Sequence, residues 1–206
     1  MKWFWLVPKD QRQNNWFLYD EVPPVVLRKR YQWLQCAECG KIDEDQALLS
    51  GLDADVQLKA RSDIVQTSDE VLCFSEKTRK IYELNNLTGL EFMDIPKDFK
   101  YKIAFPTHIL DVDLKTAAFQ YQEPCIVAGI ELPGGFCTLC GRNKGGAYVG
   151  PLKGSFDLPN NPLTICAPSI NRENSRGKIY WILVSEVVKN LFQLSHVTGA
   201  EYSEIR

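Results

Sequence analysis

The chain has 206 residues, with 24 Lys and Arg against 26 Asp and Glu, a formal net charge of −2 and 45% apolar residues. This length allows one large domain or two small ones, and either can bury a core. The composition excludes a disordered chain, and the small net charge makes general binding to nucleic acid an unfavoured function. Seven cysteines, an odd number, indicate reduced thiols, some of which can be metal ligands.

The first apolar stretch of the sequence is short. It covers five residues, Trp3 to Val7, and ends at Pro8. A signal peptide needs a longer apolar region, and a membrane-spanning helix needs about 20 apolar residues. We therefore expect no association with membranes and a reducing compartment, the cytoplasm.

An acidic block follows the first pair of cysteines. Nine carboxylates lie between Glu38 and Glu70, against three cations. Such a block is most often a solvated surface, and the alternative is a docking surface that attracts a basic partner. The candidate partner-binding residues are Asp43, Glu44, Asp45, Asp53 and Asp55.

Two segments of the chain are related without gaps. The first, SEKTRKIYELNNLTGLEFMDI, covers residues 75–95, and the second, SEVVKNLFQLSHVTGAEYSEI, covers 185–205. Seven of the 21 aligned positions are identical, whereas chance at average residue frequencies gives about one. The chain therefore contains an internal repeat.

Each repeated segment predicts the same elements. An apolar stretch before it predicts a buried strand, and the first Ser suits the N-cap of a helix whose first turn holds a Glu. Gly89 and Gly199 then allow a sharp turn into a short extended segment. Strand, helix, turn and strand thus follow one another in both copies.

A CxxCG sequence precedes each repeated segment, at residues 36–40 and 137–141. We therefore divide the chain into a first module, 1–96, a connector, 97–133, and a second module, 134–206. The predicted fold is α+β, with two related strand-helix-strand modules that each carry a CxxCG zinc knuckle and share one four-cysteine zinc site. Its ligands are Cys36, Cys39, Cys137 and Cys140.

Four thiolates around Zn²⁺ leave no open coordination position, so the predicted ion is structural. Two alternatives stay open: a dithiol redox site, and buried thiols without metal. The other cysteines, Cys73, Cys125 and Cys166, lie in apolar stretches and are expected in the core. The sequence has no GxSxG, HExxH or GxxxxGK[ST] motif, and we predict a protein that is not an enzyme.

The paired CxxCG sequences and the repeated Ser-Glu and Thr-Gly-x-Glu-[Phe/Tyr] segments resemble the double-CXXCG motif proteins, a family related to immunity proteins of polymorphic bacterial toxin systems. The resemblance implies a protein that binds and neutralises a cognate toxin in the cytoplasm. The alternative is a zinc-ribbon adaptor that binds nucleic acid or regulates another protein. It requires a basic patch formed by Lys97, Lys100, Lys102, Arg142, Lys144 and Lys153.

Overall fold

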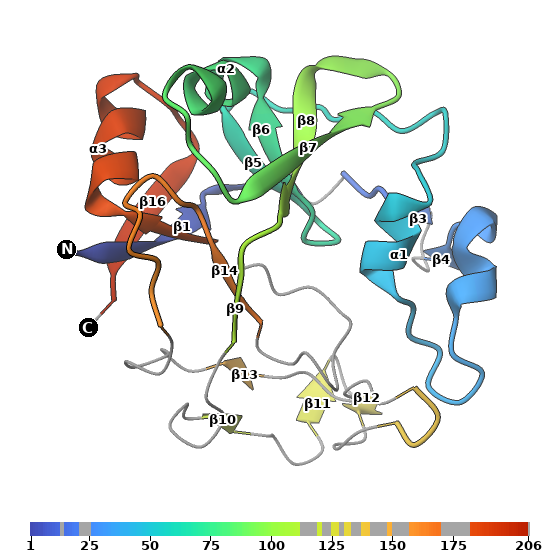
Figure 1. Ribbon diagram of the computed structural model, residues 1–206. Helices are drawn as coiled ribbons and strands as arrows, with labels where there is room; N and C mark the ends of the chain where they lie inside the picture. Colours follow the sequence, from blue (N-terminus) through green and yellow to red (C-terminus); the bar gives the residue numbers. More distant parts are fainter. Residues whose placement is uncertain are drawn as a thin grey trace.

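The computed structural model describes residues 1–12, 15–20, 26–111, 119–120, 125–127, 130–132, 137–140, 148–149, 157–169 and 182–205. These residues form a mixed α+β fold with small sheets, as the sequence predicts (Figure 1).

Two sheets carry the two repeated segments. The five-stranded sheet has the order β2 (Asp10–Arg12), β5 (Ile64–Thr67), β6 (Leu72–Ser75), β8 (Asp98–Pro106) and β7 (Leu90–Ile95). The three-stranded sheet has the order β15 (Ile182–Ser185), β1 (Trp3–Pro8) and β16 (Ala200–Glu204). The first strand of the chain thus pairs with two of the last.

The remaining described strands form two-stranded pairs. They are β3 (Tyr19–Asp20) with β4 (Val26–Leu27), β9 (Ile109–Asp111) with β14 (Ala167–Ser169), β10 (Phe119–Gln120) with β13 (Tyr148–Val149), and β11 (Cys125–Val127) with β12 (Ile130–Leu132). The helices are η1, a 3₁₀ helix (Lys29–Leu34), α1 (Glu44–Leu49), α2 (Glu76–Leu84) and α3 (Glu186–Leu194). The predicted connector, 97–133, therefore contributes β8 to the five-stranded sheet and β9, β10, β11 and β12 to two-stranded pairs.

Helices α2 and α3 begin in the same way, and the predicted caps are confirmed. The hydroxyl of Ser75 accepts a hydrogen bond from the backbone N–H of Thr78, and the hydroxyl of Ser185 accepts one from that of Val188. An acidic residue follows in the first turn of each helix, where the helix dipole favours a negative charge.

The sheets around these two helices have the same register. Tyr101 of β8 lies opposite Ser75, and Trp3 of β1 lies opposite Ser185. At the other end, Pro106 lies opposite Leu90, while Pro8 lies opposite Ala200. All four pairings are antiparallel. Strand β1 thus has the same place beside α3 that β8 has beside α2.

Two glycines allow main chain from distant segments to approach closely. Gly89 and Gly199 have φ angles of +94° and +89°. A Cβ atom would lie 1.8 Å from the carbonyl oxygen of Ile165 at Gly89, and 2.2 Å from that of Ile64 at Gly199. The adjacent Thr88 and Thr198 carbonyls accept hydrogen bonds from the N–H groups of the same two isoleucines, at 2.8 and 3.0 Å. Only glycine fits at both positions.

We predict that Gly199→Ala destabilises the protein by about 3 kcal/mol or more, because the methyl group adds a main-chain collision to the strain of a positive φ angle. Gly51→Ala is the control. Its φ angle is +90°, but the nearest atom to a Cβ is the end of the Arg30 side chain at 3.3 Å. Urea denaturation measures both changes, and equal losses of stability would contradict the close approach.

An apolar cluster joins the two segments. Phe74 and Phe192 are fully buried, and their rings meet edge to face with centroids 6.2 Å apart. Ile64 and Ile165, the isoleucines at the two glycine contacts, are fully buried in the same cluster. Each such side chain contributes about 1.5–3 kcal/mol through burial, so the two sheets depend on one another for stability.

The Asp63 carboxylate links the two repeated segments by hydrogen bonds. It accepts bonds from the N–H and hydroxyl of Thr198 at 2.9 and 3.0 Å, from the hydroxyl of Ser75 at 2.8 Å and from the ammonium of Lys77 at 3.2 Å. Burial by itself raises the pKa of Asp63, but these donors outweigh burial and hold the pKa below its usual value. The ionised form therefore stabilises the fold.

We predict that Asp63→Asn lowers the free energy of unfolding by about 2 kcal/mol at pH 7, because charge-assisted hydrogen bonds are lost. The depressed pKa means that this contribution is present above about pH 4, the unfolded pKa, and disappears as the pH falls through the folded value. The difference in free energy of unfolding between wild type and variant, measured by urea denaturation, should therefore become smaller as the pH falls. Asp94→Asn, at a carboxylate with 84% exposed side chain, should show a small difference throughout. An Asp63→Asn difference that does not change with pH would contradict the prediction.

Candidate metal centre

The first CxxCG sequence folds into a closed turn after η1. The N–H of Cys36 donates to the carbonyl of Lys41 at 2.8 Å, and the N–H of Gly40 donates to the carbonyl of Cys36 at 2.9 Å. Gly40 has a φ angle of +71°, which favours glycine. The amide of Gln35 donates to the carbonyl of Gly40 at 2.9 Å and holds the turn from outside. Both cysteines therefore lie on one rigid loop.

Glu38, between the cysteines of the first turn, reaches the second turn. Its carboxylate accepts hydrogen bonds from the hydroxyl of Thr138 at 2.8 Å and from the N–H of Leu139 at 3.1 Å. In the sequence, Glu38 counts among the carboxylates of the acidic block, and this contact was not predicted. Its position between two cysteines is the signal that could have indicated it. Gly141, the last residue of the second CxxCG sequence, lies outside the described residues.

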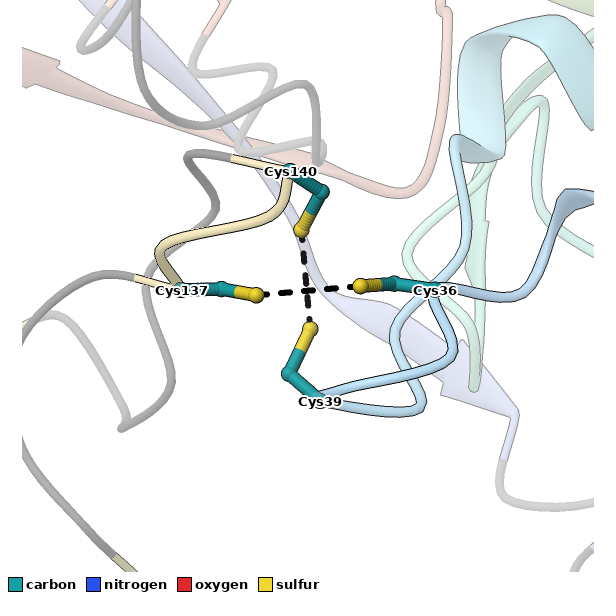
Figure 2. Close-up of side chains that lie close together, drawn as sticks. All are labelled: Cys36, Cys39, Cys137 and Cys140. Atoms are coloured by element: carbon teal, nitrogen blue, oxygen red, sulfur yellow. Dashed lines mark hydrogen bonds between the residues drawn. The ribbon is translucent and has the colours of Figure 1, made fainter.

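The four predicted cysteines come together at one point (Figure 2). Their sulfur atoms all lie within 4.8 Å of one another. Cys36 and Cys137 have their sulfurs 3.7 Å apart, and Cys39 and Cys140 have theirs 3.6 Å apart. Each close pair joins segments 101 residues apart in the sequence. Within the described part of the chain, this is the single cluster of three or more His, Cys, Asp or Glu groups able to hold a metal ion.

This arrangement fits a tetrahedral metal ion. Zinc binds thiolate sulfur at about 2.3 Å, so two ligands of a regular tetrahedron lie about 3.8 Å apart. The Cys36–Cys137 and Cys39–Cys140 distances between sulfurs agree with that value. Four thiolates suit soft or borderline ions, of which Zn²⁺ is the usual structural one. Cys36 and Cys137 are buried and Cys39 and Cys140 partly buried, which limits the access of water.

The main chain of the first turn favours a thiolate. N–H groups of Cys39 and Glu38 directed at the Cys36 sulfur lower the pKa of Cys36 to about 6. Burial has the opposite effect on Cys137, whose pKa it raises to about 12, and it also raises that of Cys39. A positive ion among the four sulfurs would favour the ionised form of all of them.

The remaining cysteines lie apart from this centre. Cys73 and Cys166 are fully buried, which confirms their predicted place in the core. Burial raises the pKa of Cys166 to about 12, so its thiol is neutral at pH 7. Cys125 lies in β11, and its side chain is not among those described.

The predicted acidic surface is partly used within the protein. Asp43 is buried at 8% exposure and caps α1, because its carboxylate accepts a hydrogen bond from the N–H of Gln46 at 3.0 Å. Glu44 and Asp45 follow in the first turn of α1 and are partly buried. These three carboxylates stabilise the start of a helix, which is the physical reason for their positions.

Asp53 and Asp55 form ion pairs with arginines. Asp55 accepts hydrogen bonds from Arg28 at 3.0 and 3.1 Å, and Asp53 lies 3.6 Å from Arg28 and 3.7 Å from Arg30. The Arg28 side chain is 14% exposed, so the two carboxylates balance a charge that is nearly buried. Among the five predicted partner-binding residues, Asp55 is the most exposed, with 67% of its side chain in contact with solvent.

The basic patch required by the adaptor alternative is described only in part. Lys102 pairs with Asp94, and Lys97 and Lys100 are exposed. Arg142, Lys144 and Lys153 lie outside the described residues. No described helix is long and apolar enough to cross a membrane.

Comparisons with protein-family models, curated proteins and solved structures find no match to this chain.

We predict that the purified protein binds one zinc ion per chain and that Cys36→Ser weakens this binding by more than about 100-fold, since three thiolates and water replace four thiolates. Cys73→Ala, which changes a core thiol, is the matched control and should keep full zinc content. Affinity should fall as the pH is lowered, because protons compete for the thiolates. Metal analysis with a chromogenic chelator measures each change. Equal zinc content in Cys36→Ser and wild type would refute the site.

Proposed function

We propose that this chain is a non-enzymatic immunity protein, which binds and neutralises a cognate bacterial toxin in the cytoplasm and contains a structural zinc ion. The observation that carries the proposal is the cluster of four sulfurs drawn from two distant segments. A tetrahedral ion with four thiolates has no position left for a substrate, so its contribution is to the stability of the scaffold.

The residues of the cluster have defined roles in this proposal. Cys36, Cys39, Cys137 and Cys140 would hold Zn²⁺, and the ion would supply a cross-link between the two CxxCG turns. Glu38 is a positioning residue, because its carboxylate fixes the second turn against the first through Thr138 and Leu139. A reducing compartment keeps such thiols available, and this agrees with a cytoplasmic protein.

The two-module architecture is part of the same proposal. The matched registers of β8 and β1, and the matched contacts of Gly89 and Gly199, support two copies of one unit. In that arrangement the second copy begins near β8, within the predicted connector, and each copy places its first strand in the sheet of the other. The resemblance to double-CXXCG motif proteins then supplies the immunity function, and a rigid scaffold with charged surfaces is suited to binding a protein.

Co-expression with the product of the neighbouring gene tests the function. We predict that the chain restores growth of cells that express this toxin, and that the two proteins co-purify as a stable complex. Protection should depend on the fold, so Cys36→Ser should weaken it, while Cys73→Ala should not. A toxin from an unrelated system is the specificity control. If the chain neither bound nor protected against any neighbouring product, the immunity proposal would fail, and nucleic-acid binding at low salt would then favour the adaptor.

A further inference from the structure

A groove lies between helix α2 and the outer strand β7, and it has a volume of about 690 Å³. Apolar side chains form part of its floor. Tyr82 and Leu90 are buried, and the Tyr82 hydroxyl is bonded to the main chain of Leu90 at 3.0 and 3.1 Å. Phe92 meets the Tyr82 ring edge to face at 5.1 Å between centroids. The floor therefore has a small apolar part, in a groove whose exposed lining is mostly polar.

The rim of this groove is acidic. Four carboxylates, Glu76, Glu83, Glu91 and Asp94, line it with two cations, Arg79 and Lys102. Arg79 forms ion pairs with both Glu76 and Glu83, and Lys102 pairs with Asp94. Two negative charges thus remain in excess, and a net negative charge in a groove attracts cations.

An exposed aromatic residue and a strand edge complete this surface. Phe99, near the start of strand β8, lines the groove and is 85% exposed. An aromatic side chain this exposed offers a large apolar contact area to a partner. Strand β7 is the last strand of its sheet in the described part of the chain. Its Leu90 main chain is already bonded to Tyr82, so an extended segment would pair with the outer edge of β7 beyond Leu90.

A second groove in the same protein has a different lining. It lies between α3 and β16, has a volume of about 560 Å³ and occupies the corresponding place in the second repeated segment. Gln193 stands there where the first groove has Glu83, and Tyr202 stands where it has Phe92. One carboxylate, Glu201, balances one lysine, Lys189. Glu186 and Glu204, which match Glu76 and Asp94, do not line this smaller groove, so its lining carries no excess charge.

We propose that the groove between α2 and β7 binds an extended, basic segment of a partner protein, whose cations meet the acidic rim and whose apolar side chain packs on Phe99. The identity of this partner as the toxin rests on the proposed function. This groove is distinct from the candidate partner-binding residues at 43–55, where helix capping and ion pairs with arginines neutralise part of the charge.

Two probes test the proposal separately from the function. The first is a short synthetic peptide in which Lys and Arg flank one Leu, with a peptide of Glu and Leu as its control. The second is the toxin encoded by the neighbouring gene. Glu91→Lys reverses a charge on β7, and Glu201→Lys makes the same change at the matching position of β16. Phe99→Ser removes the aromatic contact, and thermal unfolding checks that each variant stays folded.

The basic peptide should shift backbone amide signals of β7 and α2 in NMR spectra, and the acidic peptide should not. Glu91→Lys should weaken binding of the basic peptide about tenfold at low salt and Phe99→Ser by a similar factor, while Glu201→Lys should leave it unchanged. Shifts centred on residues 43–55, or equal effects of Glu91→Lys and Glu201→Lys, would overturn the proposal. If the toxin binds wild type and Glu91→Lys equally, this groove is wrong but the immunity function stands. If the toxin does not bind at all, the function fails while the peptide result still decides the groove.

Discussion

The structure depends on the pairing of strand β1 with β15 and β16, which joins the beginning of the chain to its end. Closing so long a loop has an entropic cost, but that cost grows only slowly with loop length. The buried side chains of Phe4 and Leu6 in the shared core oppose it. Strand β1 fills the place beside α3 that β8 fills beside α2. The sheet beside α3 is therefore incomplete until the two ends of the chain meet (Figure 1).

The cysteine cluster makes a second long-range connection, between the two CxxCG turns. Without an ion, the four close thiols form only weak hydrogen bonds with one another, and the pKa of Cys36 is lowered while that of Cys137 is raised. The cluster alone therefore contributes little to stability. With an ion of suitable size, the same sulfurs would form a strong cross-link between segments 101 residues apart. The hydrogen bonds of Glu38 across the turns bring the loops together in the arrangement that such an ion requires.

Acidic residues have two different uses in this chain. Asp43 caps a helix, Asp53 and Asp55 balance Arg28, and Asp63 accepts hydrogen bonds that join the repeated segments. Their positions are explained by the fold. The groove beside α2 differs, because its lining keeps two negative charges in excess after its ion pairs are counted. Charge that remains in excess after ion pairing is the better guide to a binding surface.

The sequence by itself determined the local elements and the chemistry of the site. Ser-Glu at a helix start, Gly89 and Gly199 at the turns and four cysteines in two pairs all follow from short-range rules, and each is found in the structure. The place of β1 could not be predicted, because WFWLVP and YKIAFP, which share one register, have only the final Pro in common. A buried strand needs apolar residues of suitable size and not particular ones, so its partners are decided by tertiary packing. The tertiary structure also decided the role of each carboxylate, because capping, ion pairing and exposure depend on which distant groups the fold brings near.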